Sequence, residues 1–567
     1  MAEQGLFPEG LTVEPPRPRG RARLFDGWTI GALLTAILIA LPVVVVVGFL
    51  AAPTGPVWKH LAQTVLASYV TNSLLLGTGV AAGTAWLGVT SAWLVTFHRF
   101  PGSRMWEWAL LLPLTMPAYV IAYTYTGLLD FSGPVQTMLR DAFGLAREDY
   151  WLPQVRSLPG AIAMMTLVLY PYVYMLTRAA FLAQSVCAVE VSRTLGLGPL
   201  ATFLKVTLPL ARPGIVAGVA LALMETLNDF GTVAHFAVDT FTTGIYRAWF
   251  GLGEPAAAAQ LGAVLMLFVL ALLVAERWSR GAARYHHTSQ RYRALPRRRL
   301  RGAAGLVAAL ACLLPVAVGF LLPVAVLAAW AIETAPVVLD RRFFTFAGNS
   351  FLLAAVTAAL AVVIALALAY AERRRPRPLL LGAVRVAGMG YAVPGAVIAI
   401  GLLLSMGTLD NAIDGWARRA FGVGTGLLVT GTIVGLVYAY LVRFLAIAFN
   451  AAEAGLAKVT PSMDGAARTL GTRPAGVLTR VHAPLIGGSV LTAALLVFVD
   501  VMKELPATLI LRPFNFDTLA IRAYQMASDE RLSEAAAPGL LIVAVGVLPV
   551  ILLSRAIARS RPGHEGP

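Results

Sequence analysis

The sequence predicts an all-α membrane protein, and three observations support this fold class. Hydrophobic residues make up 58% of the 567 residues and charged residues only 13%, about half the charged share of a soluble protein. Runs of about 20 apolar residues recur along the whole chain, each long enough to cross the roughly 30 Å hydrocarbon core as a helix. No alternation of apolar and polar residues over segments of about ten suggests a membrane barrel. A water-soluble globular protein is therefore almost excluded.

About twelve membrane-spanning helices are expected, with ends placed to within a few residues. In the first half of the chain the apolar runs lie at residues 30–50, 69–97, 106–129, 158–184, 212–236 and 258–276. In the second half they lie at residues 303–330, 349–371, 382–405, 427–449, 486–510 and 538–556. The run from Ile30 is longer than the roughly 7 to 15 apolar residues of a signal peptide, so we interpret it as an uncleaved span.

The basic residues predict the orientation. Lys and Arg number 45 against 29 Asp and Glu, a formal net charge of +16. If the spans alternate, the arginine-rich segments all fall on one side of the membrane, at residues 17–23, 98–104, 277–301 and 373–377. The positive-inside rule makes that side cytoplasmic and places both termini there. The loops of the other side, such as 130–157 and 511–537, mix both signs of charge.

The arginines between residues 277 and 301 allow two interpretations. Nine arginines and no acidic residue lie in this segment. Such clusters occur in binding sites for nucleic acid or anionic lipid, but they are also common in cytoplasmic loops of membrane proteins. We favour a cytoplasmic linker between two halves, with no nucleic-acid partner.

The two halves resemble each other in sequence. Asn-Ser at residues 72–73 recurs at 349–350, an offset of 277, and Arg-Thr-Leu-Gly at residues 193–196 recurs at 468–471, an offset of 275. We therefore predict a tandem duplication, in which two halves of about six spans share one orientation about a pseudo-twofold axis along the membrane normal. The expected division is a cytoplasmic tail at 1–28, a first half at 29–278, a basic linker at 279–302, a second half at 303–558 and a tail at 559–567.

A motif with a central glycine occurs once in each half. In the first half Glu190-Val-Ser-Arg-Thr-Leu-Gly196 is followed after nine residues by Val206-Thr-Leu-Pro209. In the second half Gly465-Ala-Ala-Arg-Thr-Leu-Gly471 is followed after nine residues by Val481-His-Ala-Pro484. Each motif predicts a short amphipathic helix, a tight turn that glycine permits, and a second short stretch ending at a proline that starts the next span.

These motifs resemble the EAA loop of permease subunits in ATP-binding-cassette importers. Beyond the loops, the chain looks like the ferric-iron permeases that fuse two six-span halves. The residues that carry this second resemblance are 225–233, 239–249, 500–508 and 512–519. The resemblance covers nearly everything from Asn72 to Ser554 and implies two tandem type I, MetI-like permease repeats in a bacterial inner membrane.

The resemblance also implies partners and roles. The partners would be a dimer of ATPase subunits and a periplasmic iron-binding protein that delivers ferric ion, which crosses the lipid bilayer by alternating access. Coupling loops are expected at residues 188–209 and 463–484, docked on the ATPase. The residues expected to serve this contact are Glu190, Arg193, Gly196, Pro209, Ala466, Arg468, Gly471 and Pro484. A plain amphipathic connecting loop is the alternative reading for each motif.

Four acidic residues lie inside predicted spans. Glu225 and Asp229 are four residues apart on one helix face, and Asp500 and Glu504 repeat this spacing at an offset of 275. Counted at 1.5 Å per residue from Pro209, Glu225 lies roughly 24 Å along its helix, in the outer half of the bilayer. A charge in the membrane interior costs at least about 2.5 to 3.5 kcal/mol, so such residues face a cavity or a partner. We predict that all four line a translocation path near the periplasmic gate, since ferric iron prefers oxygen ligands.

A purely structural role for these carboxylates is the alternative. Lys503 would then neutralise Asp500 or Glu504, while Asn228 and neighbouring hydroxyls would satisfy the other two in a helix-packing network. Phenolate oxygens could also ligate ferric iron, but packed and interfacial tyrosines are commoner in membrane helices. The tyrosines concerned are Tyr119, Tyr123, Tyr170 and Tyr174. No metal ligand is firmly assigned.

Several motifs of catalytic sites are missing from the sequence. There is no P-loop, no Gly-x-Gly-x-x-Gly opening a helix and no Gly-x-Ser-x-Gly, so no catalytic residue or bound cofactor is expected and ATP is used by the partner ATPase. Cys187 and Cys312 give no disulfide framework or metal-ligand spacing. Three alternatives remain: the same machine carrying thiamine or a phosphonate, an ion-coupled secondary transporter, and a membrane scaffold that does not transport.

Overall fold

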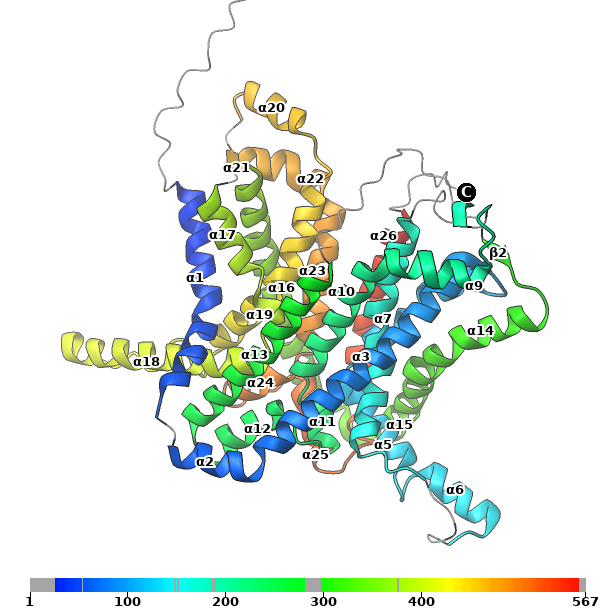
Figure 1. Ribbon diagram of the computed structural model, residues 1–567. Helices are drawn as coiled ribbons and strands as arrows, with labels where there is room; N and C mark the ends of the chain where they lie inside the picture. The colour runs from blue at the N-terminus through cyan, green and yellow to red at the C-terminus, as the bar shows by residue number, and fades with distance from the viewer. Residues whose placement is uncertain are drawn as a thin grey trace, which may run out of the picture.

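The computed structural model describes residues 26–559, apart from residues 54, 147–148, 150–151, 185–189, 193, 281–296, 375–376 and 473. Long helices run side by side between two faces of the molecule (Figure 1). We call the upper face in Figure 1 the motif face, because both glycine motifs lie there, next to α9 in the first half and at α20 and α21 in the second. The lower face, which carries α2, α12 and α25, is called the opposite face.

The described elements of the first half are α1 (Gly27–Gly48), η1 (Phe49–Ala51), α2 (Gly55–Thr64), α3 (Leu66–Phe97), β1 (His98–Arg99), α4 (Ser103–Ala109), η2 (Leu112–Thr115), α5 (Ala118–Leu129), α6 (Pro134–Phe143), α7 (Leu158–Leu182), α9 (Pro199–Thr202), η3 (Phe203–Thr207), α10 (Leu208–Asn228), α11 (Gly231–His235), α12 (Phe241–Tyr246), η4 (Arg247–Gly251) and α13 (Pro255–Arg280). The two-residue strand β1 pairs in parallel with β2, so the segment after the linker is joined to the end of α3.

The described elements of the second half are β2 (Arg298–Arg299), α14 (Ala303–Val316), η5 (Ala317–Leu321), α15 (Leu322–Val338), α16 (Arg341–Arg374), α17 (Pro378–Ala387), η6 (Gly390–Ala392), α18 (Gly395–Phe421), α19 (Ile433–Leu456), α20 (Pro461–Thr469), α21 (Pro474–Val477), η7 (Leu478–His482), α22 (Ala483–Leu485), α23 (Gly487–Met502), α24 (Pro506–Leu511), α25 (Leu519–Ser528) and α26 (Ala536–Arg559). The predicted all-α membrane fold is confirmed.

The spans differ in detail from the twelve predicted apolar runs. In the described part of the chain, nine helices are long and apolar enough to cross a membrane, or up to eleven if two bent pairs are each one span. The predicted run 106–129 bends by 88° between η2 and α5, and the run 486–510 begins with a bend of 77° at α22. The run 382–405 is divided between α17 and α18.

Two of these breaks occur at matching prolines. Pro117 precedes α5 and Pro394 precedes α18, each with an extended backbone at ψ near 140°. Proline has no N–H to donate to the preceding turn, so a helix stops before it and a new helix starts after it. The apolar content of both runs was predicted correctly, but their continuity was wrong.

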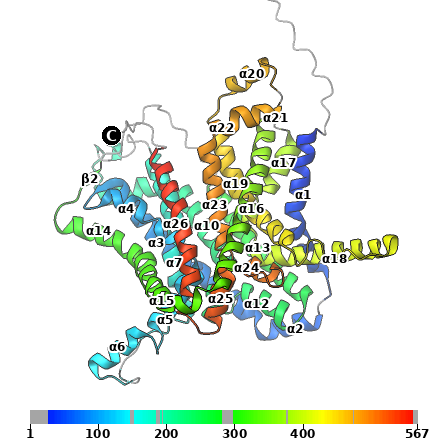
Figure 2. The same ribbon diagram turned by 180° about the vertical axis from the view of Figure 1, so that it is seen from behind.

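The first helix of the chain packs on the second half. α1 lies against α17 and α18, as both ribbon views show (Figures 1 and 2). Pro42 inside α1 leaves the carbonyl of Leu38 without its helical donor. The hydroxyl of Tyr438, on α19, donates to this carbonyl at 2.5 Å. The kink in α1 is therefore satisfied by a residue of the other half.

Matched hydrogen bonds recur in the two halves. The side-chain amide of Asn72 donates to the carbonyl of Asp239 at 2.9 Å, and that of Asn349 donates to the carbonyl of Asp517 at 3.0 Å. Single π-helical turns, η3 and η7, also precede the prolines of both motifs. These parallels support the predicted duplication.

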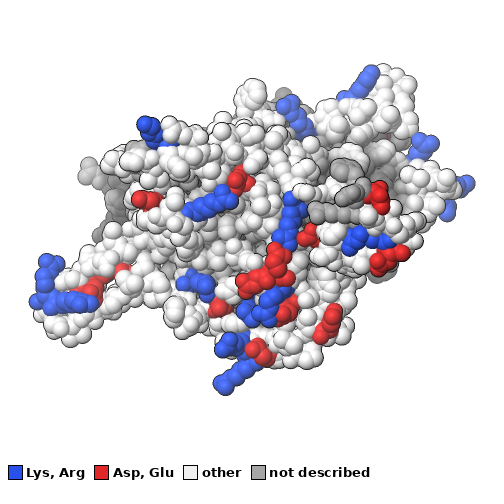
Figure 3. Space-filling model, turned by 90° about the horizontal axis from the view of Figure 1, so that it is seen from below, with Lys and Arg blue, Asp and Glu red and all other residues white. Residues whose placement is uncertain are grey.

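The opposite face carries both signs of charge, as the loop composition predicts. Acidic and basic side chains are interspersed over it in the view from below (Figure 3). One pair joins the two halves here: the guanidinium of Arg156 donates to both carboxylate oxygens of Glu530 at 2.7 and 2.6 Å.

The contact between α1 and α18 predicts opposite effects for two glycines. A Cβ at Gly401 would lie well under 3.0 Å from the carbonyl oxygen of Pro42, so we expect Gly401→Ala to lower the free energy of unfolding by about 1–3 kcal/mol. Gly415, on the same helix, has no such neighbour within 4 Å, so Gly415→Ala should be neutral or stabilising by up to about 1 kcal/mol. Thermal unfolding in detergent checks both variants, and equal shifts in Tm would contradict the close approach.

Candidate functional site

A cavity of about 80 Å³ lies between the two halves, and we call it the central cavity. It is formed where α10 and α11 of the first half meet α19, α23 and α24 of the second. All four carboxylates singled out in the sequence line it. Its polar lining is Tyr119, Tyr172, Glu225, Asn228, Asp229, Arg443, Asp500, Lys503 and Glu504. The structure therefore brings the two acidic pairs, 275 residues apart, to one place.

Two of the four carboxylates cap short helices. The carboxylate of Asp229 accepts the backbone N–H groups of Thr232 at 2.9 Å and Val233 at 3.2 Å, at the start of α11. The carboxylate of Glu504 accepts those of Ala507 at 2.8 Å and Thr508 at 3.0 Å, at the start of α24. Free N–H groups at a helix start favour an acidic partner. The observed contacts of Asp229 and Glu504 are therefore those of the purely structural role, the alternative given above.

The other two carboxylates have partners from side chains. Glu225 accepts a hydrogen bond from the hydroxyl of Tyr391 at 2.6 Å. Asp500 forms an ion pair of 2.8 Å with Lys503, three residues further along the chain. The expectation that Lys503 neutralises one of these acids is confirmed for Asp500. Both contacts lie at the boundary between the central cavity and a larger one described below.

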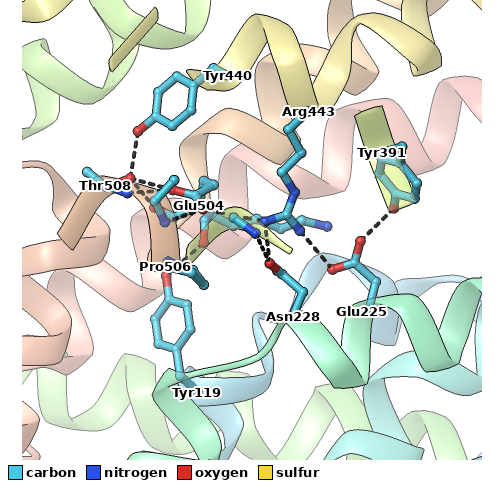
Figure 4. Close-up of polar contacts among 12 residues, drawn as sticks. Tyr119, Glu225, Asn228, Tyr391, Tyr440, Arg443, Glu504, Pro506 and Thr508 are labelled. Atoms are coloured by element: carbon cyan, nitrogen blue, oxygen red, sulfur yellow. Dashed lines mark hydrogen bonds and ion pairs between the residues drawn. The ribbon is translucent and has the colours of Figure 1, made fainter. Parts of the chain in front are cut away.

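Arg443, on α19, is the residue of this site that the sequence reasoning missed. Its guanidinium lies 3.5 Å from Glu225 of the first half and 3.5 Å from Glu504 of the second, and it donates to the side-chain oxygen of Asn228 at 2.8 Å (Figure 4). The residue is only 5% exposed. A single arginine inside the apolar run 427–449 was the available signal, because such a charge requires a partner.

Asn228 extends the network between the halves. Its side-chain oxygen also accepts the backbone N–H of Gly395 at 2.6 Å, at the start of α18. The expectation that Asn228 satisfies the neighbouring acids is wrong, because its side-chain oxygen accepts from Arg443 and from the backbone of the other half.

The tyrosines give little support to metal ligation. Among the four singled out in the sequence, only Tyr119 lines the central cavity. Its hydroxyl donates to the carbonyl of Lys503 at 3.4 Å, and that of Tyr174 donates to the carbonyl of Glu107 at 2.8 Å. Within the described residues, no group of three or more His, Cys, Asp or Glu side chains is placed to hold a metal ion.

A second cavity, of about 650 Å³, lies between the central cavity and the motif face. Asp500, Lys503 and Tyr172 line both cavities. Its remaining walls are mainly apolar and come from both halves, including Met175, Leu221, Met224, Ile447, Leu496 and Val550. Arg277, in the last turn of α13, lies at its motif-face end. Between the two halves, the space is therefore large on the motif-face side of the charged residues and small around the charged residues themselves.

The glycines of the two motifs share an unusual backbone. Gly196 has φ +80° and Gly471 has φ +76°, a region that residues with side chains rarely adopt. The preceding leucines, Leu195 and Leu470, are 75% and 85% exposed. Each motif thus presents an apolar side chain beside a left-handed turn at the surface of the motif face.

The other residues of the motifs are placed as follows. Glu190, Pro209, Ala466 and Pro484 are exposed, and each proline lies in the first turn of the following helix. Arg193 lies outside the described residues, and the side chain of Arg468 does too. The expected contacts of these two arginines stay predictions.

A buried ionic cluster anchors the second motif. Asp464 of α20 accepts hydrogen bonds from Arg373 at 3.0 Å and contacts the ring of His482 at 2.5 Å. Burial alone would raise the pKa of Asp464, but the hydrogen bonds from Arg373 and His482 outweigh it and lower that pKa. Thr96 and Thr207 occupy the corresponding sequence positions in the first half.

Comparison with known proteins shows similarity to transport permeases. Residues 84–279 match the family described as binding-protein-dependent transport system inner membrane component. The chain is 27% identical to the Fe(3+)-transport system permease protein FbpB 2 of Haemophilus influenzae, over 86% of this chain and 90% of the relative. It is 23% identical to the putative ferric transport system permease protein FbpB 1 of the same organism, over 82% of this chain and 73% of the relative.

A shorter relative matches about two fifths of the chain. The molybdenum transport system permease protein ModB of Escherichia coli is 28% identical over 39% of this chain and 93% of its own length. The chain is therefore a multi-pass inner membrane protein and the permease component of a binding-protein-dependent transporter of the ATP-binding-cassette type.

Proposed function

We propose that this permease imports ferric iron, delivered by a periplasmic binding protein and driven by ATP hydrolysis on a partner ATPase. The motif face is then cytoplasmic, with both termini on it, and the opposite face is periplasmic. Both ferric relatives named above match more than 80% of the chain and carry ferric transport in their names.

The observation that carries this proposal is the convergence of four carboxylates from both halves on the central cavity. Carboxylate oxygens suit a hard cation such as ferric iron. The cavity lies on the interface between the halves, where a path along the pseudo-twofold axis would run. The larger cavity on its motif-face side would then be the exit toward the cytoplasm, in a conformation that is closed toward the periplasm.

The same charges argue against an anionic cargo. Four acids and two bases line the central cavity, a formal charge of −2. Molybdate or a phosphonate would be repelled there, although a molybdenum permease is among the relatives. Thiamine, a cation, stays an alternative that the specificity of the binding protein decides. An ion-coupled secondary transporter would leave the two exposed motifs without a role.

The motifs would supply the coupling to ATP. The exposed leucine and left-handed glycine of each motif form a projecting apolar point that suits docking in a groove of an ATPase. When the ATPase closes on ATP, the two motifs would be drawn together, and this motion would shift the permease toward its periplasm-open state. Four residues expected at this contact, Glu190, Ala466, Pro209 and Pro484, lie on the exposed surface.

Removing one carboxylate from each half should impair transport. We expect Glu225→Gln combined with Asp500→Asn to lower ATP-dependent iron uptake about tenfold or more, the scale for losing groups that support a metal site. The measurement is uptake of radioactive ferric iron into proteoliposomes with the binding protein and the ATPase. Glu254→Gln with Glu333→Gln, two exposed acids outside the cavity, is the matched control. Normal uptake by the cavity variant would refute the proposed translocation path.

Replacing either motif glycine should uncouple hydrolysis from transport. Valine at position 196 or 471 would strain the left-handed turn by about 1–3 kcal/mol, so we expect Gly196→Val and Gly471→Val to keep the membrane fold but to lose ATP-driven uptake. Gly198 has φ −66° and open space around it, so Gly198→Val serves as the control. Uptake and ATPase rates are measured together, and wild-type coupling in both motif variants would refute the docking role.

The ionic cluster predicts that the second motif is the more rigidly mounted one. Asp464→Asn should speed backbone hydrogen exchange in α20 about tenfold or more, because a hydrogen bond to a charged group contributes about 1.5–3 kcal/mol. Since the pKa of Asp464 is lowered, its contribution is fully present at neutral pH and is lost only as the pH falls through that lowered value. Exchange in α9 of the first motif is the internal control, and unchanged protection of α20 would contradict the prediction.

A further inference from the structure

We propose that Arg443 is the latch of the periplasmic gate: its guanidinium ties the two halves together while the path is empty, and the transported cation releases it by taking over the carboxylates. This inference rests on the proposed function, because a gate has meaning only in a permease. It adds a named residue and an exchange of cations to that function.

The contacts of Arg443 cross from one half to the other. The side chain extends from α19 of the second half, and Glu225 and Asn228, at 3.5 and 2.8 Å, belong to α10 of the first half (Figure 4). Its third partner, Glu504, belongs to its own half and at the same time fixes the start of α24. Arg443 therefore connects the last turn of α10 to the helix break between α23 and α24.

Burial makes this link strong while no other cation is present. The side chain of Arg443 is 6% exposed, and that of Glu225, its partner across the interface, is 20% exposed. Removing one partner of a buried ion pair typically costs about 3–5 kcal/mol, because the other charge is left without compensation. Separating the halves at this level would impose such a cost on Glu225, the carboxylate across the interface that would lose Arg443. A cation entering the central cavity would supply the missing charge and remove the cost.

The geometry also allows release. Both ion pairs are 3.5 Å long, whereas charge-assisted hydrogen bonds are usually about 2.7–2.9 Å. The Nε of Arg443 is buried without a hydrogen-bond partner among the described residues. The guanidinium is thus held by charge more than by a saturated hydrogen-bond network, and a competing multivalent cation can displace it.

Two other ion pairs near the interface lack either the contact between the halves or the burial. Lys503 and Asp500 lie on consecutive turns of one segment, so their contact does not join the halves. Arg156 and Glu530 do join them, but their side chains are 32% and 62% exposed. An exposed pair typically contributes about 0–1 kcal/mol. Arg443 combines burial with a contact across the interface.

The latch is a property of one half only. At the offsets of 275 and 277 that relate the two halves, Arg443 corresponds to Val168 and Thr166 of α7. At this aligned position, the second half alone carries a guanidinium.

The test measures the gate directly, without iron. Spin labels at Leu252 and Phe514, which are 52% and 94% exposed in loops of opposite halves on the opposite face, report the separation of the halves by pulsed electron spin resonance. The labels are introduced after replacing Cys187 and Cys312 by alanine. We expect Arg443→Met to raise the ratio of open to closed permease about 5- to 150-fold, the range of typical coupling between sites.

Controls separate the latch from general loss of a buried charge. Glu225→Gln breaks the same contact from the other half and should produce the same shift, which decides the question if the Arg443 variant does not fold. Arg178→Met removes a buried arginine paired with Glu107 inside the first half, and Arg156→Gln removes the exposed contact between the halves. Neither should open the gate. Unchanged distances in both latch variants, or an equal shift in either control, would overturn the proposal.

The exchange step has its own readout, with gallium(III) citrate as a diamagnetic trivalent probe. Arg443→Met should bind gallium more tightly than the wild type in equilibrium dialysis, and adding Glu225→Gln should abolish the gain. Equal binding by all three proteins would overturn the exchange of cations. A wild-type complex that transports no iron would instead refute the proposed function, while the label distances would still decide whether Arg443 holds the gate.

Discussion

A charge inside a membrane protein requires a partner, and here Arg443 finds its partners in both halves of the chain. The contact with Glu225 and Asn228 fixes α10 against α19, at the level where the interface between the halves is tightest. On the motif side of this level the interface widens into a cavity of about 650 Å³. The state of the permease, closed at the level of Arg443 and open on its motif side, therefore depends on how a few buried charges are paired.

Broken helices create the polar ends that this pairing uses. α10 stops at Asn228 and α23 at Met502, and each is followed by a short helix whose free N–H groups are capped by the next acid, Asp229 or Glu504. The acid one turn earlier, Glu225 or Asp500, is left to face the cavity. The same spacing of four residues thus produces, in each half, one carboxylate that caps a helix and one that is paired with side chains at the cavity.

The sequence predicts the membrane fold, the two glycine motifs and the convergence of the four acids, because each depends on local pattern or on the internal repeat. It does not reveal Arg443 as their partner, since spacing along a helix specifies a face but not the residue opposite it, which here is 61 positions away for Glu504 and 215 for Asn228. The break at Pro394 inside an apolar run and the packing of α1 on the second half were missed for a related reason. Hydropathy shows which segments are apolar, but it does not show which neighbouring residue forms the hydrogen bonds that a broken helix leaves open.

The asymmetry of the charges follows from what a conduit must do. Two identical carboxylate pairs facing each other would form a site of high negative charge that holds a trivalent cation strongly, and conduction requires a site from which the ion can also leave. Arg443 and Lys503, both from the second half, reduce the formal charge of the cavity from −4 to −2. They also keep the carboxylates paired when no ion is present. In the proposed function, the duplication supplies the symmetric acids, and the two basic residues of one copy turn a symmetric binding site into a path that can be emptied.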